Sequence, residues 1–231
     1  LGPEVTAFEQ EFAAATGAAE AAGVNTGTDA LALALMALGI GAGDEVITSP
    51  LSAAYTALAI DMAGARPVFA DLDPARLTLD PAAALAAVTR RTRAIMPVHL
   101  YGQPADMPGI HAVAARHGLA VIEDACQAHL ATCGGVPVGR GSAAAAYSFY
   151  PTKNLGALGD GGAVTTDDPA LAARVRRLRN GGQSTRYRHE ERGVNSRLDE
   201  LQAAVLRARL PRLTAATAAR RRLAARYRSG L

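Results

Sequence analysis

The sequence predicts an α/β protein of three layers, in which a mostly parallel sheet is flanked by helices on both faces. Two observations support this prediction. Strand-like and helix-like segments alternate from about residue 25 to residue 166 of the 231 residues. Several strand-like segments are apolar throughout, rather than alternately apolar and polar, which is typical of parallel strands buried on both faces.

Four helices in this region are marked by their ends. Three apolar segments are each followed by glycine, which readily adopts the left-handed conformation that closes a helix. These segments are 31–38 before Gly39, 52–63 before Gly64 and 108–117 before Gly118. The fourth helix, 81–88, is predicted from its beginning, where Asp80 can cap the N-terminus and Pro81 occupies the first turn.

Short apolar runs separate these helices and are predicted to form the strands of the sheet. In chain order they are 45–48, 67–70, 94–100, 119–122, 144–149 and 162–166. After Pro169 the pattern becomes helical. The helices predicted there are 171–179, 198–209 and 213–228, and the polar segment 181–193 is expected to be an exposed loop.

Cysteine content and apolar run length exclude several classes of protein. The two cysteines, Cys126 and Cys133, lack the second pair of ligands that a zinc site needs, so we expect no metal site. With no secretory signal they are expected to be reduced thiols in a cytoplasmic protein. No apolar run reaches the roughly 18 to 20 residues that a membrane span needs, so no membrane partner is expected.

Charge is distributed unevenly along the chain. Residues 174–231 carry a net charge of +12, whereas the first 173 residues carry −9. We interpret the basic region as solvated helical faces, because its arginines lie at helical spacing among leucine and alanine. Nucleic-acid binding is an alternative, but the region has neither interleaved aromatic side chains nor a known reader motif, so we expect no nucleic-acid partner.

Polar residues follow two of the predicted strands at their carboxyl ends, where sheets of this class bind ligands. Asp124 and Gln127 follow the strand 119–122. Ser148 lies at the end of the strand that begins at residue 144, and Lys153 follows that strand. The turn Thr26-Gly27-Thr28 opens a helix, and the free N–H groups of a helix N-terminus can bind a phosphate. These features are predicted to form one site.

Together these residues meet the chemical requirements of pyridoxal 5'-phosphate (PLP). This cofactor needs an amine to form a Schiff base, a carboxylate beside its pyridine nitrogen and a cradle for its phosphate. The chain has 23 arginines and a single lysine, Lys153. Arginine cannot form the Schiff base because its guanidinium stays protonated, so Lys153 must be the amine if PLP binds.

Eight stretches of the chain carry a family resemblance. They are 1–5 (LGPEV), 25–31 (NTGTDAL), 43–47 (GDEVI), 64–69 (GARPVF), 97–104 (PVHLYGQP), 123–129 (EDACQAH), 148–156 (SFYPTKNLG) and 193–199 (GVNSRLD). With them the chain resembles the DegT/DnrJ/StrS-type sugar aminotransferases, a branch of the fold-type I PLP enzymes. Asp-x-x-Gln together with Ser-Phe-x-Pro-x-Lys is specific to this branch.

The resemblance implies a role for each matching residue. Lys153 is the catalytic lysine that forms the Schiff base, Asp124 is the partner of the pyridine nitrogen, and Gln127 hydrogen-bonds the phenolic oxygen of the ring. The implied phosphate ligands are Thr28 and Asp29 through their backbone, Ser148, and Asn195 from the neighbouring subunit of a homodimer with shared active sites. Arg197 is implied to help bind the amino donor or an anionic part of the substrate. We expect His129 to be a buried, hydrogen-bonded core residue instead.

The resemblance also implies domains and an activity. Residues 1–210 would form the PLP-binding large domain, and 211–231 would begin the connection to a small C-terminal domain that is largely absent from this chain, which we therefore expect to be part of a longer protein. The implied activity is transfer of an amino group from L-glutamate or L-glutamine to a keto-sugar, which the resemblance implies to be nucleotide-linked, or to a ketocyclitol.

The chain departs from the family pattern at two positions, and the loss of the ring-stacking aromatic, together with the short chain, keeps an alternative open. Ala53 stands where members often have an aromatic residue that stacks on the cofactor ring, with Tyr55 or Leu51 as possible replacements, and Leu130 stands where glycine is usual. A protein that had lost its ring contact would be a non-catalytic PLP-fold partner or regulatory protein of a homologous aminotransferase.

Overall fold

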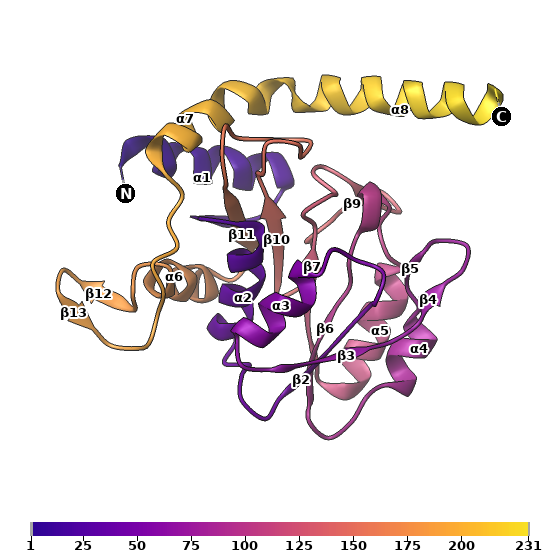
Figure 1. The fold of residues 1–231 in the computed structure, drawn as a ribbon, viewed down its shortest axis with the longest axis horizontal. Coiled ribbons are helices and arrows are strands. Elements are labelled where there is room, and N and C mark those ends of the chain that lie inside the picture. The colour runs from indigo at the N-terminus through magenta and orange to yellow at the C-terminus, as the bar shows by residue number, and fades with distance from the viewer. Residues whose placement is uncertain (1, 231) are drawn as a thin grey trace.

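A seven-stranded sheet divides the molecule, and the computed structural model, which describes residues 2–230, confirms the predicted α/β architecture (Figure 1). In spatial order the strands are β1 (Glu20–Val24), β11 (Gly162–Thr166), β10 (Ala144–Ser148), β7 (Ala120–Asp124), β6 (Thr92–Met96), β2 (Glu45–Thr48) and β3 (Arg66–Phe69). Strand β11 is antiparallel to both of its neighbours, and every other adjacent pair is parallel. Leu1 and Leu231, the outer limits of the predicted domains, lie outside the described residues.

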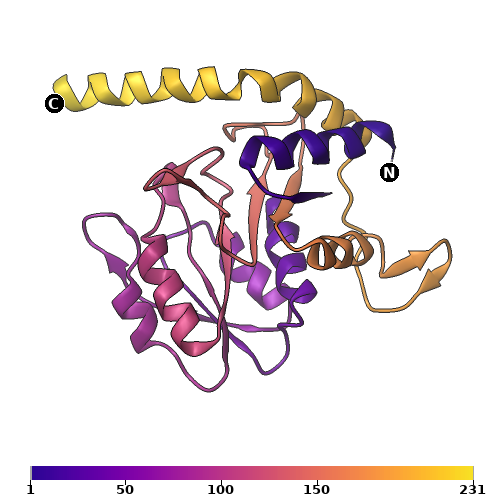
Figure 2. The same cartoon turned by 180° about the vertical axis from the view of Figure 1, so that it is seen from behind.

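Helices cover both faces of the sheet (Figures 1 and 2). In chain order they are α1 (Pro3–Thr16), α2 (Gly27–Ala37), α3 (Tyr55–Met62), α4 (Pro81–Ala86), α5 (Met107–His117), α6 (Pro169–Leu178), α7 (Glu200–Arg209) and α8 (Leu213–Gly230), with short 3-10 turns η1 (Leu100–Gly102) and η2 (Leu210–Arg212). One face is covered by α2, α3 and α6, and the other by α1 and α7 at one end and α4 and α5 at the other. Within the described part of the chain, no helix is both long and apolar enough to cross a membrane.

Strand β10 shows how both faces of the sheet are buried. Ala144 and Ala146 pack into the core beneath α2, whereas Ala145 and Tyr147 pack into the core beneath α1. Side chains of successive strand residues point to opposite faces, so a strand between two helical layers must be apolar at every position. The small alanine side chains on the α2 side let that helix lie close to the strand.

Two elements before residue 25 were not predicted. Helix α1 buries Val5, Phe8 and Phe12, which recur at helical spacing, and Gly17 closes the helix with φ +75°. Strand β1 then forms an edge of the sheet beside β11. The predicted elements after residue 25 are all present, with ends displaced by up to four residues.

The displaced ends have local causes. Helix α2 begins at Gly27, in the turn predicted to open it and four residues before its predicted apolar segment, because the Thr26 side chain accepts a hydrogen bond from the Asp29 N–H and caps it. Strand β6 ends at Met96, although Val98 still pairs with Asp124 through an isolated bridge, and the chain turns only at η1, where Tyr101 has φ +55°. The predicted exposed loop 181–193 is exposed but contains a small antiparallel ribbon, β12 (Gln183–Thr185) with β13 (Arg188–His189).

Two more two-stranded ribbons were also absent from the predictions. They are β4 (Leu72–Asp73) with β5 (Thr78–Leu79), and β8 (Thr132–Cys133) with β9 (Val136–Pro137). Both lie outside the seven-stranded sheet. Strands of two residues carry too few side chains to show a periodic pattern in the sequence.

The N-terminal helix is attached to the sheet by a buried ion pair. The Glu9 carboxylate contacts the Arg179 guanidinium and accepts the Gly23 N–H at 2.8 Å. Arg179 also donates to the Gly23 carbonyl at 2.6 Å. Because Glu9 and Arg179 are only 8% and 4% exposed, their charges depend mainly on each other for solvation. The half-buried Arg176 is a second, more distant cation for Glu9, at 3.5 Å.

His129 differs from the prediction in one respect. It is buried, as expected, and lies against the rings of Tyr147 and Phe149. However, neither ring nitrogen forms a hydrogen bond of good geometry within residues 2–230, and only the Ser148 backbone lies close enough to raise the pKa of the ring. The predicted hydrogen bonding is therefore wrong for the structure as described. Burial lowers the pKa of His129 to about 4, and the positive charge of Lys153 acts in the same direction.

The Glu9–Arg179 pair gives a stability prediction. Replacement of Arg179 by alanine (R179A) leaves the buried Glu9 carboxylate with only the more distant and more exposed Arg176, at 3.5 Å, as its cation, which should lower the free energy of unfolding by up to about 3–5 kcal/mol. Urea denaturation followed by circular dichroism measures this change. The control is R188A, which removes an arginine from the exposed Arg188–Glu190 pair and should have no measurable effect. Equal effects of the two variants would contradict the prediction.

His129 gives a prediction about pH. Its pKa is about 4 in the folded protein and about 6.5 when unfolded, so the unfolded chain binds more protons between these values. The free energy of unfolding should therefore fall as pH is lowered from 6.5 to 4, by up to about 1.4 kcal/mol per pH unit from this residue.

Urea denaturation at a series of pH values tests this expectation. The variant H129F removes the titrating group but keeps a ring against Tyr147 and Phe149, so its pH slope should be smaller. H117F removes a histidine from an exposed position and should leave the slope in place. A slope unchanged in H129F would show that another group causes it.

Candidate active site

The predicted polar residues meet at one edge of the sheet. Strands β7 and β10 are parallel neighbours, with Ala146 opposite Asp124, so their carboxyl ends lie together. The N-terminus of α2 reaches the same edge. A Cβ atom on Gly27 would lie 2.6 Å from Ser148 Cβ and 2.8 Å from the sulfur of Cys126, so only glycine allows this close approach.

Asp124 is held in place by two donors. Its carboxylate accepts a hydrogen bond from the Thr56 hydroxyl at 2.8 Å and another from the Cys126 N–H at 3.1 Å. The residue is 7% exposed, and no described cation forms an ion pair with it. A buried carboxylate with hydrogen bonds but no paired cation is suited to hold a proton on a basic ligand atom.

Gln127 has a defined orientation. Its side-chain oxygen accepts the Tyr101 N–H at 2.8 Å. A backbone N–H can only donate, so the acceptor end of the amide faces Tyr101 and the NH₂ group points elsewhere. Gln127 is half-buried. Its amide is therefore a fixed donor near the strand end that carries Asp124.

Lys153 lies in a tight loop directly after β10. Its N–H donates to the Tyr150 carbonyl at 2.8 Å, and a Cβ on Gly156 would lie 2.4 Å from the Pro151 carbonyl oxygen. The residue is half-buried. The loop thus returns on itself immediately after the strand and keeps the lysine at the sheet edge.

The pKa of the Cys126 thiol is affected by the charged groups at this edge of the sheet. Burial raises the pKa of its thiol, and the charge of Asp124 and a hydrogen bond to Asp124 raise it further, whereas the charge of Lys153 opposes them. The thiol is therefore protonated at neutral pH and serves as a packing group beneath Gly27. The opposed effects also show that Asp124 and Lys153 both lie within electrostatic range of one atom.

The first turn of α2 has backbone N–H groups that are available to a ligand. No hydrogen bond within residues 2–230 uses the backbone N–H of Gly27 or Thr28, whereas the Asp29 N–H already donates to the Thr26 side chain at 3.0 Å. A Cβ on Gly162 would lie 2.3 Å from the Thr26 carbonyl oxygen, so β11 also crowds this turn. The free N–H groups and the helix dipole make the turn a potential anion site.

A second segment crosses this turn from far along the chain. The Ser196 hydroxyl donates to the Asp29 carboxylate at 2.8 Å and accepts the Asn25 N–H at 3.1 Å. The neighbouring side chains of Asn195 and Arg197 are exposed, and Arg197 donates to the Asn180 amide oxygen at 3.1 Å. The structure therefore brings residues 195–197 next to α2 without placing Asn195 in this chain's own site.

Two residues that hold the site were missed in the sequence. Thr56 and Ser196 contact Asp124 and Asp29 over 68 and 167 positions of chain, and no local pattern marks a hydroxyl as such a partner. In the segment that leads to Thr56, Leu51, Ala53 and Tyr55 are all exposed. All three side chains are accessible to solvent, and we assign to none of them the stacking contact with the cofactor ring that an alanine at position 53 cannot make.

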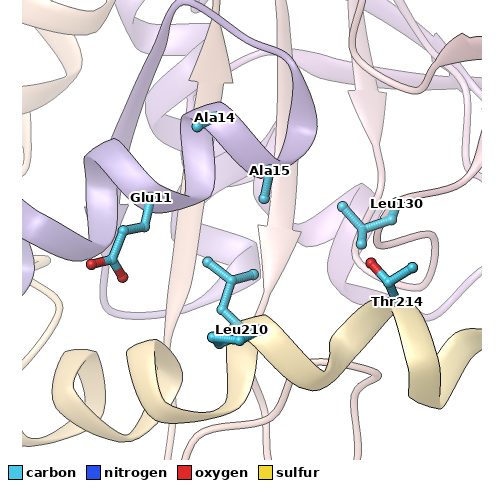
Figure 3. A pocket seen from close by; sticks show the side chains of 7 residues that line it. Glu11, Ala14, Ala15, Leu130, Leu210 and Thr214 are labelled. Carbon is cyan, nitrogen blue, oxygen red and sulfur yellow. The ribbon is translucent and has the colours of Figure 1, made fainter.

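A groove elsewhere on the molecule lacks the polar lining of this candidate site. It has a volume of about 450 Å³ and lies between α1 and the η2–α8 segment (Figure 3). Its lining is mainly apolar, and its one carboxylate, Glu11, is paired with Arg207 at 2.7 Å. In the described part of the chain, no cluster of three His, Cys, Asp or Glu residues is arranged to hold a metal ion.

Known proteins are similar to this chain in sequence and in fold. All 231 residues match the DegT/DnrJ/EryC1/StrS aminotransferase family. The chain is 54% identical over its whole length to a dTDP-3-amino-3,4,6-trideoxy-alpha-D-glucose transaminase of Streptomyces venezuelae, of which it covers 61%. It is 55% identical over 230 residues to the erythromycin biosynthesis sensory transduction protein EryC1 of Saccharopolyspora erythraea, of which it covers 63%.

The structural comparison agrees. The crystal structure of DesV from S. venezuelae superposes with a TM-score of 0.98 at 55% identity, covering 100% of this chain and 62% of that one. The chain thus spans about three fifths of the length of the relatives it matches. Sequence and fold together show that the chain belongs to the DegT/DnrJ/EryC1/StrS aminotransferase family.

Proposed function

We propose that the protein containing this chain is a PLP-dependent aminotransferase. It would move an amino group from L-glutamate or L-glutamine to a nucleotide-linked keto-sugar or a ketocyclitol. The observation that carries the proposal is the meeting of a sole lysine, a buried carboxylate and an open helix N-terminus at one sheet edge. The transaminase name of the S. venezuelae relative supports the same class of reaction.

Asp124 and Gln127 are suited to the ring of PLP. The Asp124 carboxylate, held by Thr56 and Cys126, can keep a proton on the pyridine nitrogen. The Gln127 NH₂ group, turned away from Tyr101, can donate to the phenolic oxygen. When bound, PLP supplies an electron sink for the carbon from which the substrate loses its proton.

Lys153 has two tasks in this proposal. Its amine Nζ would hold the cofactor covalently, and the same Nζ, when free, would be the base that takes the proton from the α-carbon of the amino donor. The tight loop that ends at Gly156 supports both tasks, because it keeps the lysine beside the strand ends. Lys153 is therefore the proposed catalytic residue.

The phosphate is proposed to bind at the start of α2. The N–H groups of Gly27 and Thr28 are its first donors, together with the Ser148 hydroxyl beneath them. Asp29 was also predicted to contribute through its backbone, but its N–H already has a partner in Thr26, so we assign it a supporting place in the turn.

The remaining parts of the proposal concern the whole protein. Residues 1–210 are proposed as the PLP-binding large domain and 211–231 as the beginning of the connection to a small C-terminal domain. Helix α8 extends past the sheet, and Leu213 is its one buried residue in the described range, as suits a connecting helix (Figure 1). We also propose a cytoplasmic homodimer, in which the exposed Asn195 reaches the partner's phosphate site.

A non-catalytic regulatory protein is the second candidate. Two observations favour it, namely the alanine at position 53 and the name of the S. erythraea relative as a sensory transduction protein. The two candidates differ in one measurable respect. Only an aminotransferase converts bound PLP to pyridoxamine phosphate when L-glutamate or L-glutamine is added.

The function is tested through Lys153. With PLP, the protein should absorb visible light, and L-glutamate or L-glutamine should abolish that band. In a separate sample without amino donor, borohydride reduction followed by peptide mass mapping should label Lys153, because the chain has no other lysine. The control K153R keeps the positive charge but cannot form the Schiff base, so it should show neither band nor label. A band without a half-reaction would favour the regulatory candidate.

The phosphate turn is tested through Gly27. The variant G27A places a Cβ in space that Ser148 and Cys126 occupy, so the helix start must move away from β10. We expect the dissociation constant for PLP to rise by about tenfold or more. Absorbance titration with PLP measures it.

The matched control for this variant is G159A. A Cβ on Gly159 meets only the end of the flexible Gln202 side chain, at 3.2 Å, so PLP affinity should stay unchanged. If G27A binds PLP as tightly as the unmodified protein, then the start of α2 is not the phosphate site.

A further inference from the structure

A buried chain of hydrogen bonds lies beside Asp124 and is not used by the proposed reaction. His99 Nε2 is 2.8 Å from the Glu123 carboxylate, which also contacts the Ser142 hydroxyl at 2.5 Å and the Gly139 N–H at 2.9 Å. Ser142 in turn is 2.9 Å from His111 Nε2. His99 and Glu123 are at most 1% exposed. A fully buried carboxylate needs such partners, and in this case one of them is the side chain of His99.

The direction of each hydrogen bond follows from one backbone group. The Ala105 N–H donates to His99 Nδ1 at 3.1 Å, so Nδ1 carries a lone pair and the ring proton is on Nε2. Nε2 therefore donates to Glu123, which acts only as an acceptor. Glu123 thus holds His99 in the tautomer that leaves Nδ1 free to accept from Ala105.

His99 closes the loop that runs from residue 99 to residue 105. Its backbone N–H donates to the Asp124 carbonyl at 3.1 Å, and its side chain accepts the Ala105 N–H at the other end. Between these points Tyr101 and Gly102 have φ +55° and φ +83°. A left-handed tyrosine is uncommon, and this one is 83% exposed, so packing of its own ring does not hold it.

The left-handed turn is what presents a donor to Gln127. The Tyr101 N–H donates to Gln127 Oε1 at 2.8 Å. The turn also packs on the backbone of the same residue, since a Cβ on Gly102 would lie 3.3 Å from the Gln127 carbonyl oxygen. The orientation of the Gln127 amide therefore depends on the shape of the loop that His99 closes.

We propose that His99 is a positioning residue for the site. By closing the loop 99–105 through Nδ1, it holds the Tyr101 N–H on Gln127 and so keeps the Gln127 NH₂ group available to donate to the cofactor. Glu123 fixes the tautomer that this requires. The inference rests on the proposed function, because Gln127 matters only if PLP is bound.

Two substitutions of His99 separate its two hydrogen bonds. In H99N the amide oxygen can replace Nδ1 and accept from Ala105, but the side chain is too short to reach Glu123. In H99Q the longer amide can donate to Glu123 in place of Nε2, but it leaves the Ala105 N–H without its acceptor. The pair therefore isolates the contact that closes the loop.

The measured quantity is the dissociation constant for PLP, from absorbance titration, in a double-mutant cycle with Q127A. We expect H99Q to weaken PLP binding by about fivefold to tenfold, within the range of one hydrogen bond, and H99N to weaken it by less than about twofold. In the Q127A background the effect of H99Q should disappear, because both changes act through one amide. A purely structural role would give the same H99Q effect in both backgrounds.

Two further measurements complete the test. S142A removes another hydrogen bond from Glu123, so it should lower the melting temperature and leave PLP affinity unchanged. Amide hydrogen exchange on the unmodified protein needs no variant to fold: the Tyr101 N–H should be protected although the residue is exposed. Rapid exchange at Tyr101, or equal effects of H99Q and H99N, would overturn the proposal. If the unmodified protein binds no PLP, the proposed function fails instead.

Discussion

The close packing of the start of α2 against β10 and β11 is the constraint on which the rest of the site depends. Gly27 and Gly162 make this packing possible, because a Cβ at either position would meet Ser148 or the Thr26 backbone. The approach places two free N–H groups beside the strand ends that carry Asp124 and Lys153. A bulkier residue at either glycine would separate the anion site from the amine.

A layer of polar groups behind the site gives three of its side chains a fixed direction. Thr56 orients the carboxylate of Asp124, Ser196 orients that of Asp29, and the Tyr101 N–H orients the amide of Gln127. Partners of this kind matter because a side chain that binds a ligand must already hold its productive rotamer when the ligand arrives. These contacts join segments from most of the chain at one edge of the sheet.

The sheet itself explains why the chemistry gathers at that edge. Parallel strands end on the same side, so residues that follow β7 and β10 become neighbours although they are more than twenty positions apart. The antiparallel β11 enters at this edge with Gly162 and leaves room for the turn before α2. Buried charge pairs such as Glu9–Arg179 lie elsewhere and attach the outer helices without entering the site.

The sequence by itself determined the fold class, most of the elements and the identity of the residues that now meet at the site. Apolar runs, capping glycines and a single lysine are local signals, which can be read without knowing what lies nearby. Only the tertiary structure decided which hydroxyl holds Asp124, that the Asp29 N–H is already used, that His129 lacks a hydrogen-bond partner in the described range and that His99 closes the loop over Gln127. These facts depend on contacts between distant segments, and one hydrogen bond between such segments leaves no periodic pattern in the chain.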